Sequence, residues 1–212
     1  MNSFRRFGTF VAPLCLFGLW AFLRFYLIMK IRRFIFQSAD IGNEERVLIN
    51  HGLIVLEAFF LFSLFALLRK MRRIDGFYLL RDPKASVQYG IISGLFIFAI
   101  TIPVALYFGM TYSPQFATTG AIGNIFSNGA EEVIYRGILF SAALLIFRKS
   151  WFGILIVSIA FGLGHWDLPI LFQAYIGIVG LVLGLTYIRT KSLAAPYLAH
   201  MIADILADSF FH

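Results

Sequence analysis

Four ionisable residues lie within or beside apolar segments of the sequence: Glu131, His165, His200 and Asp204. Because a charged side chain near the centre of a bilayer costs roughly 2.5 kcal/mol or more, a group kept there indicates a functional site. A carboxylate that takes a proton from water, assisted by a histidine, is a general base for attack on a carbonyl. A second histidine and a protonated or hydrogen-bonded carboxyl group can donate to the developing oxyanion. These residue types therefore predict hydrolysis of a peptide bond.

A second carboxylate follows directly after Glu131. Side chains of adjacent helical residues point about 100° apart, so Glu131 and Glu132 cannot share one task. Glu132 and Arg136 are four residues apart and can pair on one face of a helix. We therefore expect Glu131 to face a cavity and the Glu132–Arg136 pair to support it. His200 and Asp204 are also four residues apart and face one way.

The sequence predicts that a helix begins just before the acidic pair. Asn128 and Glu131 have the spacing of a capping box, in which the first residue caps the helix and the second lies in its first turn. The partial positive charge of a helix N-terminus would stabilise a carboxylate there. The three glycines between residues 120 and 129 leave a second interpretation open, a broken or re-entrant segment.

The composition predicts an integral membrane protein. Of the 212 residues, 60% are hydrophobic and 14% are charged, which is more apolar side chain than a soluble core of this length can bury. We expect an all-α fold, a polytopic transmembrane bundle of about seven to eight helices. Residues 1–212 would form one membrane domain, with N-terminal spans in 7–119 and a catalytic core in 120–212. The C-terminal four helices would form the catalytic cavity.

Basic residues flank the apolar runs, and their distribution predicts the topology. The net charge of +7 therefore suits anionic lipid headgroups rather than nucleic acid. The positive-inside rule places the connections 69–84, 148–149 and 189–191 on the cytoplasmic side. The basic residues in 30–33 disagree with this orientation, because they would lie on the outer side.

Three polar residues of the N-terminal half have other expected roles. Arg24 is expected to extend its charged end to the membrane interface, and His51, at the edge of a span, is expected to be interfacial. Glu57, near the middle of an apolar segment, is expected to form a hydrogen bond between helices or to line a cavity. None of the three is assigned to catalysis.

The sequence disfavours covalent and zincin-type catalysis. It contains no G-x-S-x-G nucleophile motif and no His-Glu-x-x-His zinc motif. Its single cysteine, Cys15, lies in the first apolar run with no catalytic motif around it. We expect no cofactor and no metal, although a zinc site built from His165, His200 and a carboxylate is a weaker alternative.

Three motifs together resemble those of the CPBP family, which comprises CAAX prenyl endopeptidases and bacteriocin-processing enzymes, also called Abi proteins. They are Glu131-Glu132-x-x-x-Arg136, Phe161-x-x-x-His165 and His200-x-x-x-Asp204, in this order on successive hydrophobic segments. The resemblance extends over residues 121–209. It implies that Glu131 and His165 activate the water, and that His200 and Asp204 stabilise the oxyanion. Glu132, Arg136 and Phe161 would support them. Family members with asparagine at the last position donate from an amide, whereas Asp204 must be protonated or act through water.

The leading hypothesis is an intramembrane glutamic endopeptidase that cleaves a membrane-associated, lipid-modified or leader peptide. The alternative is a non-catalytic immunity or scaffold protein that binds a peptide or partner helix in the same cavity, because a fold does not settle a function. The expected partners are membrane lipids and a peptide or protein substrate, and no nucleic acid. The compact chain without a targeting signal suggests a multi-pass protein of a prokaryotic plasma membrane.

Overall fold

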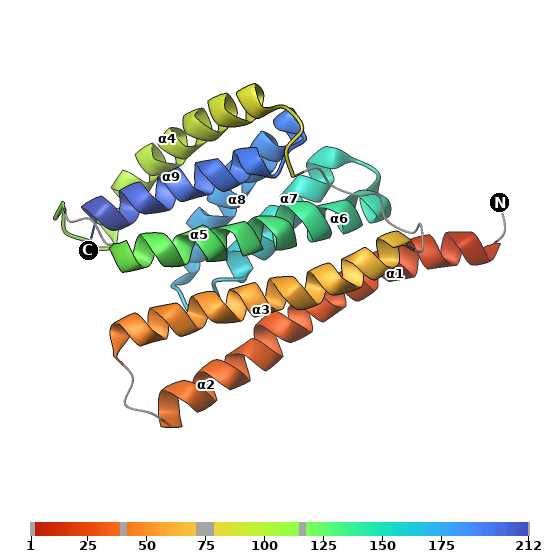
Figure 1. Cartoon of the computed structure of the whole chain (residues 1–212), viewed down its shortest axis with the longest axis horizontal. Coiled ribbons are helices and arrows are strands. Elements are labelled where there is room, and N and C mark those ends of the chain that lie inside the picture. Colours follow the sequence, from red (N-terminus) through yellow and green to blue (C-terminus); the bar gives the residue numbers. More distant parts are fainter. Residues whose placement is uncertain (1–2, 39–41, 71–78, 115–117, 212) are drawn as a thin grey trace.

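The computed structural model describes residues 3–38, 42–70, 79–114 and 118–211, and within these ranges the fold is all-helical (Figure 1). The described residues form seven continuous helical segments, two of which contain a π-helical turn. They are α1–η1–α2 (Ser3–Phe22, Leu23–Ile28 and Met29–Ser38), α3 (Asn43–Lys70), α4 (Pro83–Tyr107), α5–η2–α6 (Thr118–Glu132, Val133–Leu139 and Phe140–Phe147), α7 (Ser150–Leu163), α8 (Ile170–Thr190) and α9 (Ala194–Phe210). The predicted all-α bundle is confirmed.

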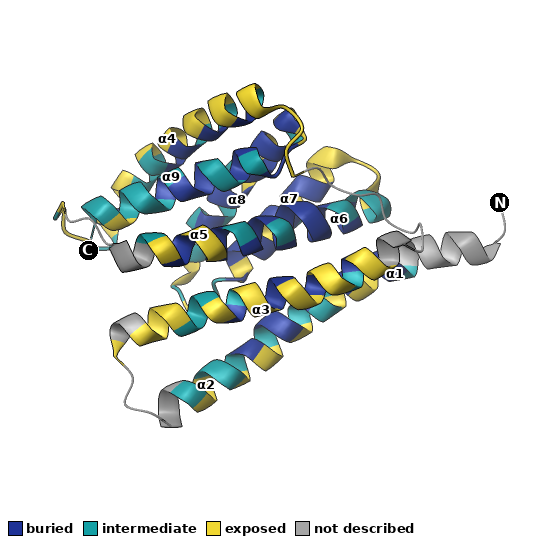
Figure 2. Ribbon diagram, viewed as in Figure 1, coloured by how far each residue is buried: buried dark blue, intermediate teal, exposed yellow. Residues whose placement is uncertain are grey.

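The helix that carries the acidic pair is central to the bundle. In Figure 1 α5 lies between α3 and α9, and it contacts both. The helical turns that follow the acidic pair, in η2, are deeply buried (Figure 2), and apolar residues such as Ile134 and Ile138 are fully enclosed there. The acidic pair therefore lies in the interior and not at an exposed helix end.

The predicted helix start at Asn128 is wrong. Helix α5 begins at Thr118, so Asn128 lies inside a continuous helix and Glu131 and Glu132 are its last residues before η2. The alternative of a broken segment in 120–129 does not match this continuous helix either, whereas a re-entrant placement in the membrane stays a prediction. Packing of α5 against α3 and α9 favours continued helix over the local capping signal, since tertiary contacts override weak local preferences.

Two glycines allow α4 to pack closely on α9. A Cβ atom added to Gly90 would lie 2.9 Å from Leu198 Cδ2, and one added to Gly94 would lie 2.9 Å from the carbonyl oxygen of Ala199. Glycines four residues apart lie on one helix face and let two backbones approach, as in membrane helix pairs. This contact holds the part of α9 that contains His200.

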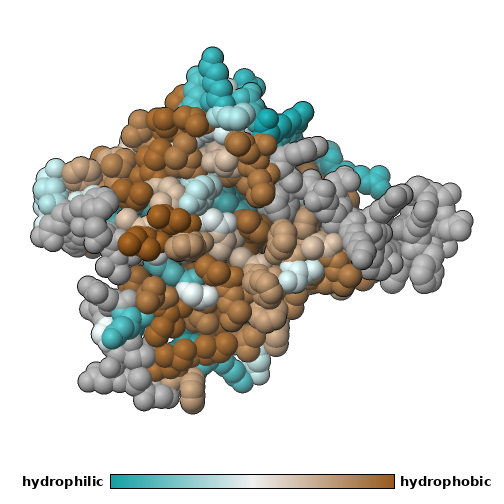
Figure 3. Space-filling view, in the orientation of Figure 1, coloured by the Kyte–Doolittle hydropathy of each residue, from teal (hydrophilic) through white to brown (hydrophobic). Residues whose placement is uncertain are grey.

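The outer faces of the bundle are apolar, as expected for a membrane protein. Among the described helices, four are long and apolar enough to cross a membrane, at Val11–Ile35, Glu45–Leu67, Pro83–Tyr107 and Ile170–Thr190. Large hydrophobic side chains such as Phe59 and Ile92 are exposed on these helices. Figure 3 shows hydrophobic residues over most of the described face, with hydrophilic residues gathered toward its edges.

Candidate active site

One cavity, of about 360 Å³, brings together the four residues predicted to be catalytic. Glu131 reaches it from the end of α5, His165 from the turn after α7, and His200 and Asp204 from α9. These residues come from three separate segments of the chain, and the cavity is where their side chains meet. Phe161, predicted as a supporting residue, also lines it.

The cavity extends beyond the C-terminal four helices that were expected to form it. Helix α3 contributes His51 and Ile54, and helix α4 contributes Ile97 and Thr101. This follows from the packing of α3 on α5 and of α4 on α9. His51, which was expected at the membrane interface, lines this cavity, and its ring lies against Gly123.

Three side-chain pairs link α5 to α9 at intervals of four residues: Asn124 with Asp208, Asn128 with Asp204, and Glu132 with His200. The corresponding N–O distances are 2.8, 2.8 and 3.0 Å. Positions four apart share one face of a helix, so two antiparallel helices can make such a pair on each turn. These three pairs hold α9 against α5, and they therefore set the positions of His200 and Asp204 relative to Glu131.

Glu132 does not line this cavity, but it bonds to His200, which does. It is 1% exposed, and its Oε1 accepts hydrogen bonds from Arg136 Nη1 at 2.8 Å and from His200 Nδ1 at 3.0 Å. Arg136 also donates from Nη2 to the carbonyl oxygen of Gly180, and its guanidinium lies 4.6 Å from the centre of the Phe161 ring. The predicted i,i+4 pairing is present, and the same Glu132 oxygen also bonds to the His200 ring.

The hydrogen bond of His165 sets its tautomer. Its Nδ1 lies 2.9 Å from the carbonyl oxygen of Phe161. A carbonyl only accepts, so Nδ1 must carry the proton, and Nε2 of the neutral ring is left as an acceptor. The Phe161 ring lies edge-on to His165 and to His200, at 5.3 and 5.8 Å between ring centres. His165 can therefore accept a hydrogen bond from a water molecule in the cavity.

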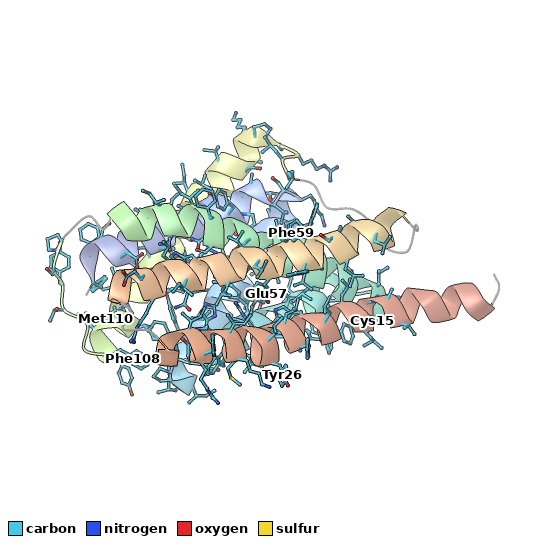
Figure 4. All side chains as sticks on the ribbon, turned by 60° about the horizontal axis from the view of Figure 1, so that its bottom comes forward. Cys15, Tyr26, Glu57, Phe59, Phe108 and Met110 are labelled. Atoms are coloured by element: carbon cyan, nitrogen blue, oxygen red, sulfur yellow. The ribbon has the colours of Figure 1, made fainter. Side chains whose placement is uncertain are left out.

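Glu131 is 5% exposed, and its nearest cation comes from the first helix. Arg24 Nη2 lies 3.6 Å from Glu131 Oε1, while Nη1 donates to Glu57 Oε2 at 3.0 Å. The expectation that Arg24 extends to the interface is wrong, because a buried carboxylate on each side retains its guanidinium in the interior. The interhelical hydrogen bond expected of Glu57 is present. Figure 4 shows Glu57 on the side of α3 that faces the first helix.

The sequence interpretation did not identify several polar residues of this site: Arg24, His51, Asn124 and Asp208. A four-residue period, Asn124, Asn128 and Glu132 on one segment and His200, Asp204 and Asp208 on another, was the signal for two of them. No comparable spacing connects Arg24 or His51 to the motifs. Within the described ranges, no group of three or more His, Cys, Asp or Glu side chains is arranged to hold a metal ion.

Comparison with known families identifies the motif-bearing region. Residues 113–206 match the model of the family described as type II CAAX prenyl endopeptidase Rce1-like. The match spans all three motifs, and for this region it confirms the resemblance to the CPBP family. No curated protein and no solved structure matches the chain.

Proposed function

Because residues 113–206 match a family of CAAX-type intramembrane proteases, we propose that this chain is a glutamic endopeptidase. It would hydrolyse a peptide bond of a substrate held at the bilayer. The observation that carries the proposal is the meeting of Glu131, His165, His200 and Asp204 at one cavity of a membrane protein. A buried Glu/His set at membrane depth is costly to keep and so indicates a function.

In the proposed reaction, Glu131 acts as the general base. A water molecule between Glu131 and His165 gives one proton to the Glu131 carboxylate, while its other hydrogen donates a hydrogen bond to His165 Nε2 and so orients the water. Its oxygen then bonds to the carbonyl carbon, and the carbonyl oxygen becomes an oxyanion. Glu131 passes the proton to the leaving nitrogen as the C–N bond breaks. The products are a carboxyl group and an amine.

His200 is the proposed donor to the oxyanion. Its Nδ1 bonds to the Glu132 carboxylate, and its Nε2 lies 3.6 Å from Asp204 Oδ2. Carboxylates at both nitrogens favour the ring that carries two protons, and Nε2–H can then donate to the developing charge. Asp204, held by Asn128 Nδ2 at 2.8 Å, would act by charging and orienting His200.

The proposed substrate is a lipid-modified or otherwise membrane-associated peptide, in keeping with the CAAX prenyl substrates in the family's name. The apolar exterior of the bundle suits a substrate that is itself held in the bilayer. We further propose that the protein resides in a prokaryotic plasma membrane and acts without a metal.

A peptide panel tests this function. Purified protein in liposomes is mixed with a farnesylated CAAX peptide, its unmodified form and a hydrophobic leader peptide, and products are identified by mass spectrometry. The proposal expects cleavage that survives a chelator and is lost in Glu131→Ala and His165→Ala. The exposed Glu45 provides a matched control, Glu45→Gln, which should cleave normally. Tight binding of a peptide without any product would instead indicate the scaffold function.

A further inference from the structure

The guanidinium of Arg24 lies next to Glu131 although it comes from outside the family-matched residues 113–206. Arg24 is 5% exposed. Its Nη1 is 3.0 Å from Glu57 Oε2, and its Nη2 is 3.3 Å from the Tyr135 hydroxyl and 3.6 Å from Glu131 Oε1. One cation thus connects the first helix, α3 and the helix that carries the acidic pair.

The position of Arg24 is built by packing on both sides. It lies in η1, the π-helical stretch Leu23–Ile28, and π-helical turns frequently mark functional sites. One turn earlier, Trp20 packs edge-on against Tyr135 at 5.9 Å between ring centres. The Tyr135 hydroxyl occupies the space beside Gly164, where the side chain of any larger residue would collide with it. Arg24 is therefore held at a defined place.

Arg24 reaches the cavity only through Glu131. Glu131 lines the cavity, whereas Arg24 is absent from the described residues that form its wall. A substrate in the cavity would contact the carboxylate and not the guanidinium. Any influence of Arg24 on the reaction must pass through the position and charge of Glu131.

We propose that Arg24 is a positioning residue for hydrolysis, which holds the Glu131 carboxylate beside a positive charge and in place to take a proton from water, with Glu57 as the second partner of the same guanidinium. The inference rests on the proposed function. It also explains why two buried carboxylates share one cation. When Glu131 accepts the proton its charge disappears, and Arg24 remains neutralised by Glu57. A buried cation without a counter-charge would be strongly unfavourable.

Several other groups contribute to the electrostatic environment of Glu131. Those in the described residues are Glu57 and His51 on α3, Tyr135 and Arg136 on η2, His165 after α7, and His200 and Asp204 on α9. Of these, Glu57 and Tyr135 also accept hydrogen bonds from Arg24. Variants at Glu57 therefore separate the effect of Glu57 on Glu131 from the effect of Arg24.

The test compares four variants of the full chain on a cleaved peptide in liposomes: Arg24→Lys, Arg24→Met, Glu57→Gln, and Arg24→Met combined with Glu57→Gln. Arg24→Met should lower kcat by about tenfold to a hundredfold, because a small misplacement of a catalytic group has effects of this size. KM should change little, since Arg24 does not line the cavity. Arg24→Lys should recover part of the rate, and Glu57→Gln, which can still accept from Arg24, should keep most of it.

The double variant distinguishes positioning from charge neutralisation. If Arg24 only compensates the buried Glu57 charge, removing both charges restores kcat, and the proposal is overturned. If Arg24 positions Glu131, the double variant stays as slow as Arg24→Met. The acidic limb of the kcat profile should also move to higher pH in both Arg24→Met backgrounds, because the carboxylate has lost its cation. A uniform loss at every pH would contradict the proposal.

A double-mutant cycle on thermal stability tests the contact between Arg24 and Glu131 without measuring catalysis. Melting temperatures are measured in detergent for the wild type, Arg24→Met, Glu131→Gln and their combination. The proposal expects non-additive effects, since each single change removes the same interaction. Additive effects overturn it even if Glu131→Gln abolishes cleavage. Normal cleavage by Glu131→Gln would instead refute the proposed function, whatever the cycle shows.

Discussion

At the scale of single residues, Glu132 is a buried charge that contacts the proposed active site without lining its cavity. One of its oxygens accepts hydrogen bonds from both Arg136 and His200. Arg136 is 2% exposed and is the largest of the fully buried side chains described. In such a place the pair is stable only when both charges are present, because an unpaired buried ion is strongly destabilising.

Arg136→Met is expected to lower the free energy of unfolding by about 3–5 kcal/mol, the range observed when one partner of a buried ion pair is removed. Denaturant titration in detergent micelles measures it. Arg32 provides a surface control, because it pairs at 3.3 Å with the partly exposed Asp167. Arg32→Gln should change the same quantity by at most about 1 kcal/mol. Equal losses in the two variants would contradict the interpretation of Arg136.

The motif residues could be predicted because each is a charged or aromatic group within an apolar segment. Glu131, His165, His200 and Asp204 needed only their types, their spacing and the cost of burial. Arg24 could not be identified in this way. A long basic side chain near the end of an apolar run usually extends to the interface, and only the packing of the first helix against α3 and η2 places it beside Glu131.

At the scale of elements, the site depends on how closely α9 is held between α4 and α5. The contact with α5 is polar, through the three side-chain pairs, and the contact with α4 is steric, through Gly90 and Gly94. The two contacts restrain α9 from opposite sides. We therefore expect a change on α4 to alter the position of His200, although α4 carries none of the proposed catalytic groups.

Gly94→Ala tests this steric contact. The added Cβ would lie 2.8 Å from Ile202 Cβ and 2.9 Å from the Ala199 carbonyl oxygen. Overpacking of this kind costs about 1–3 kcal/mol, and the shift of α9 should also lower kcat. The matched control is Gly52→Ala on α3, where no heavy atom lies within 4 Å and the change should stabilise the helix by up to about 1 kcal/mol. A harmless Gly94→Ala would refute the close contact.

Element types were predictable from the apolar runs, but the start of α5 was not. The capping signal at Asn128 is a local preference worth about 1 kcal/mol, and the side chain serves instead as the partner of Asp204 on α9. The same residue type is suited to both tasks. The partner helix, which is distant in the sequence, decides between them.

At the scale of the whole molecule, the N-terminal helices complete the site of the family-matched region. Helices α3 and α4 line the cavity, and the first helix supplies Arg24. We therefore propose that residues 1–212 act as one membrane domain. Arg32 pairs with Asp167 at the turn after α7, so the end of the first helix lies at the same end of the bundle as that turn.

The orientation is testable by cysteine labelling in a Cys15→Ala background, which removes the only native thiol. Lys84 lies in the first turn of α4, and Met110 follows the C-terminal end of this helix. The positive-inside rule places Lys84 and Lys149 in the cytoplasm. An impermeant maleimide should therefore label Met110→Cys in intact cells, and Lys84→Cys and Lys149→Cys only after lysis. The reverse pattern would show that the topology is inverted.

The central claim is that the Glu131 carboxylate removes a proton from the attacking water. Its most direct test is kcat for the best peptide substrate with wild type, Glu131→Gln and Glu45→Gln in the same liposomes. Glutamine keeps the shape of the side chain but is not a general base. We expect Glu131→Gln to lose about 10²- to 10⁴-fold, the usual contribution of a general base, with Glu45→Gln unchanged. A Glu131→Gln rate close to that of the wild type would contradict the account.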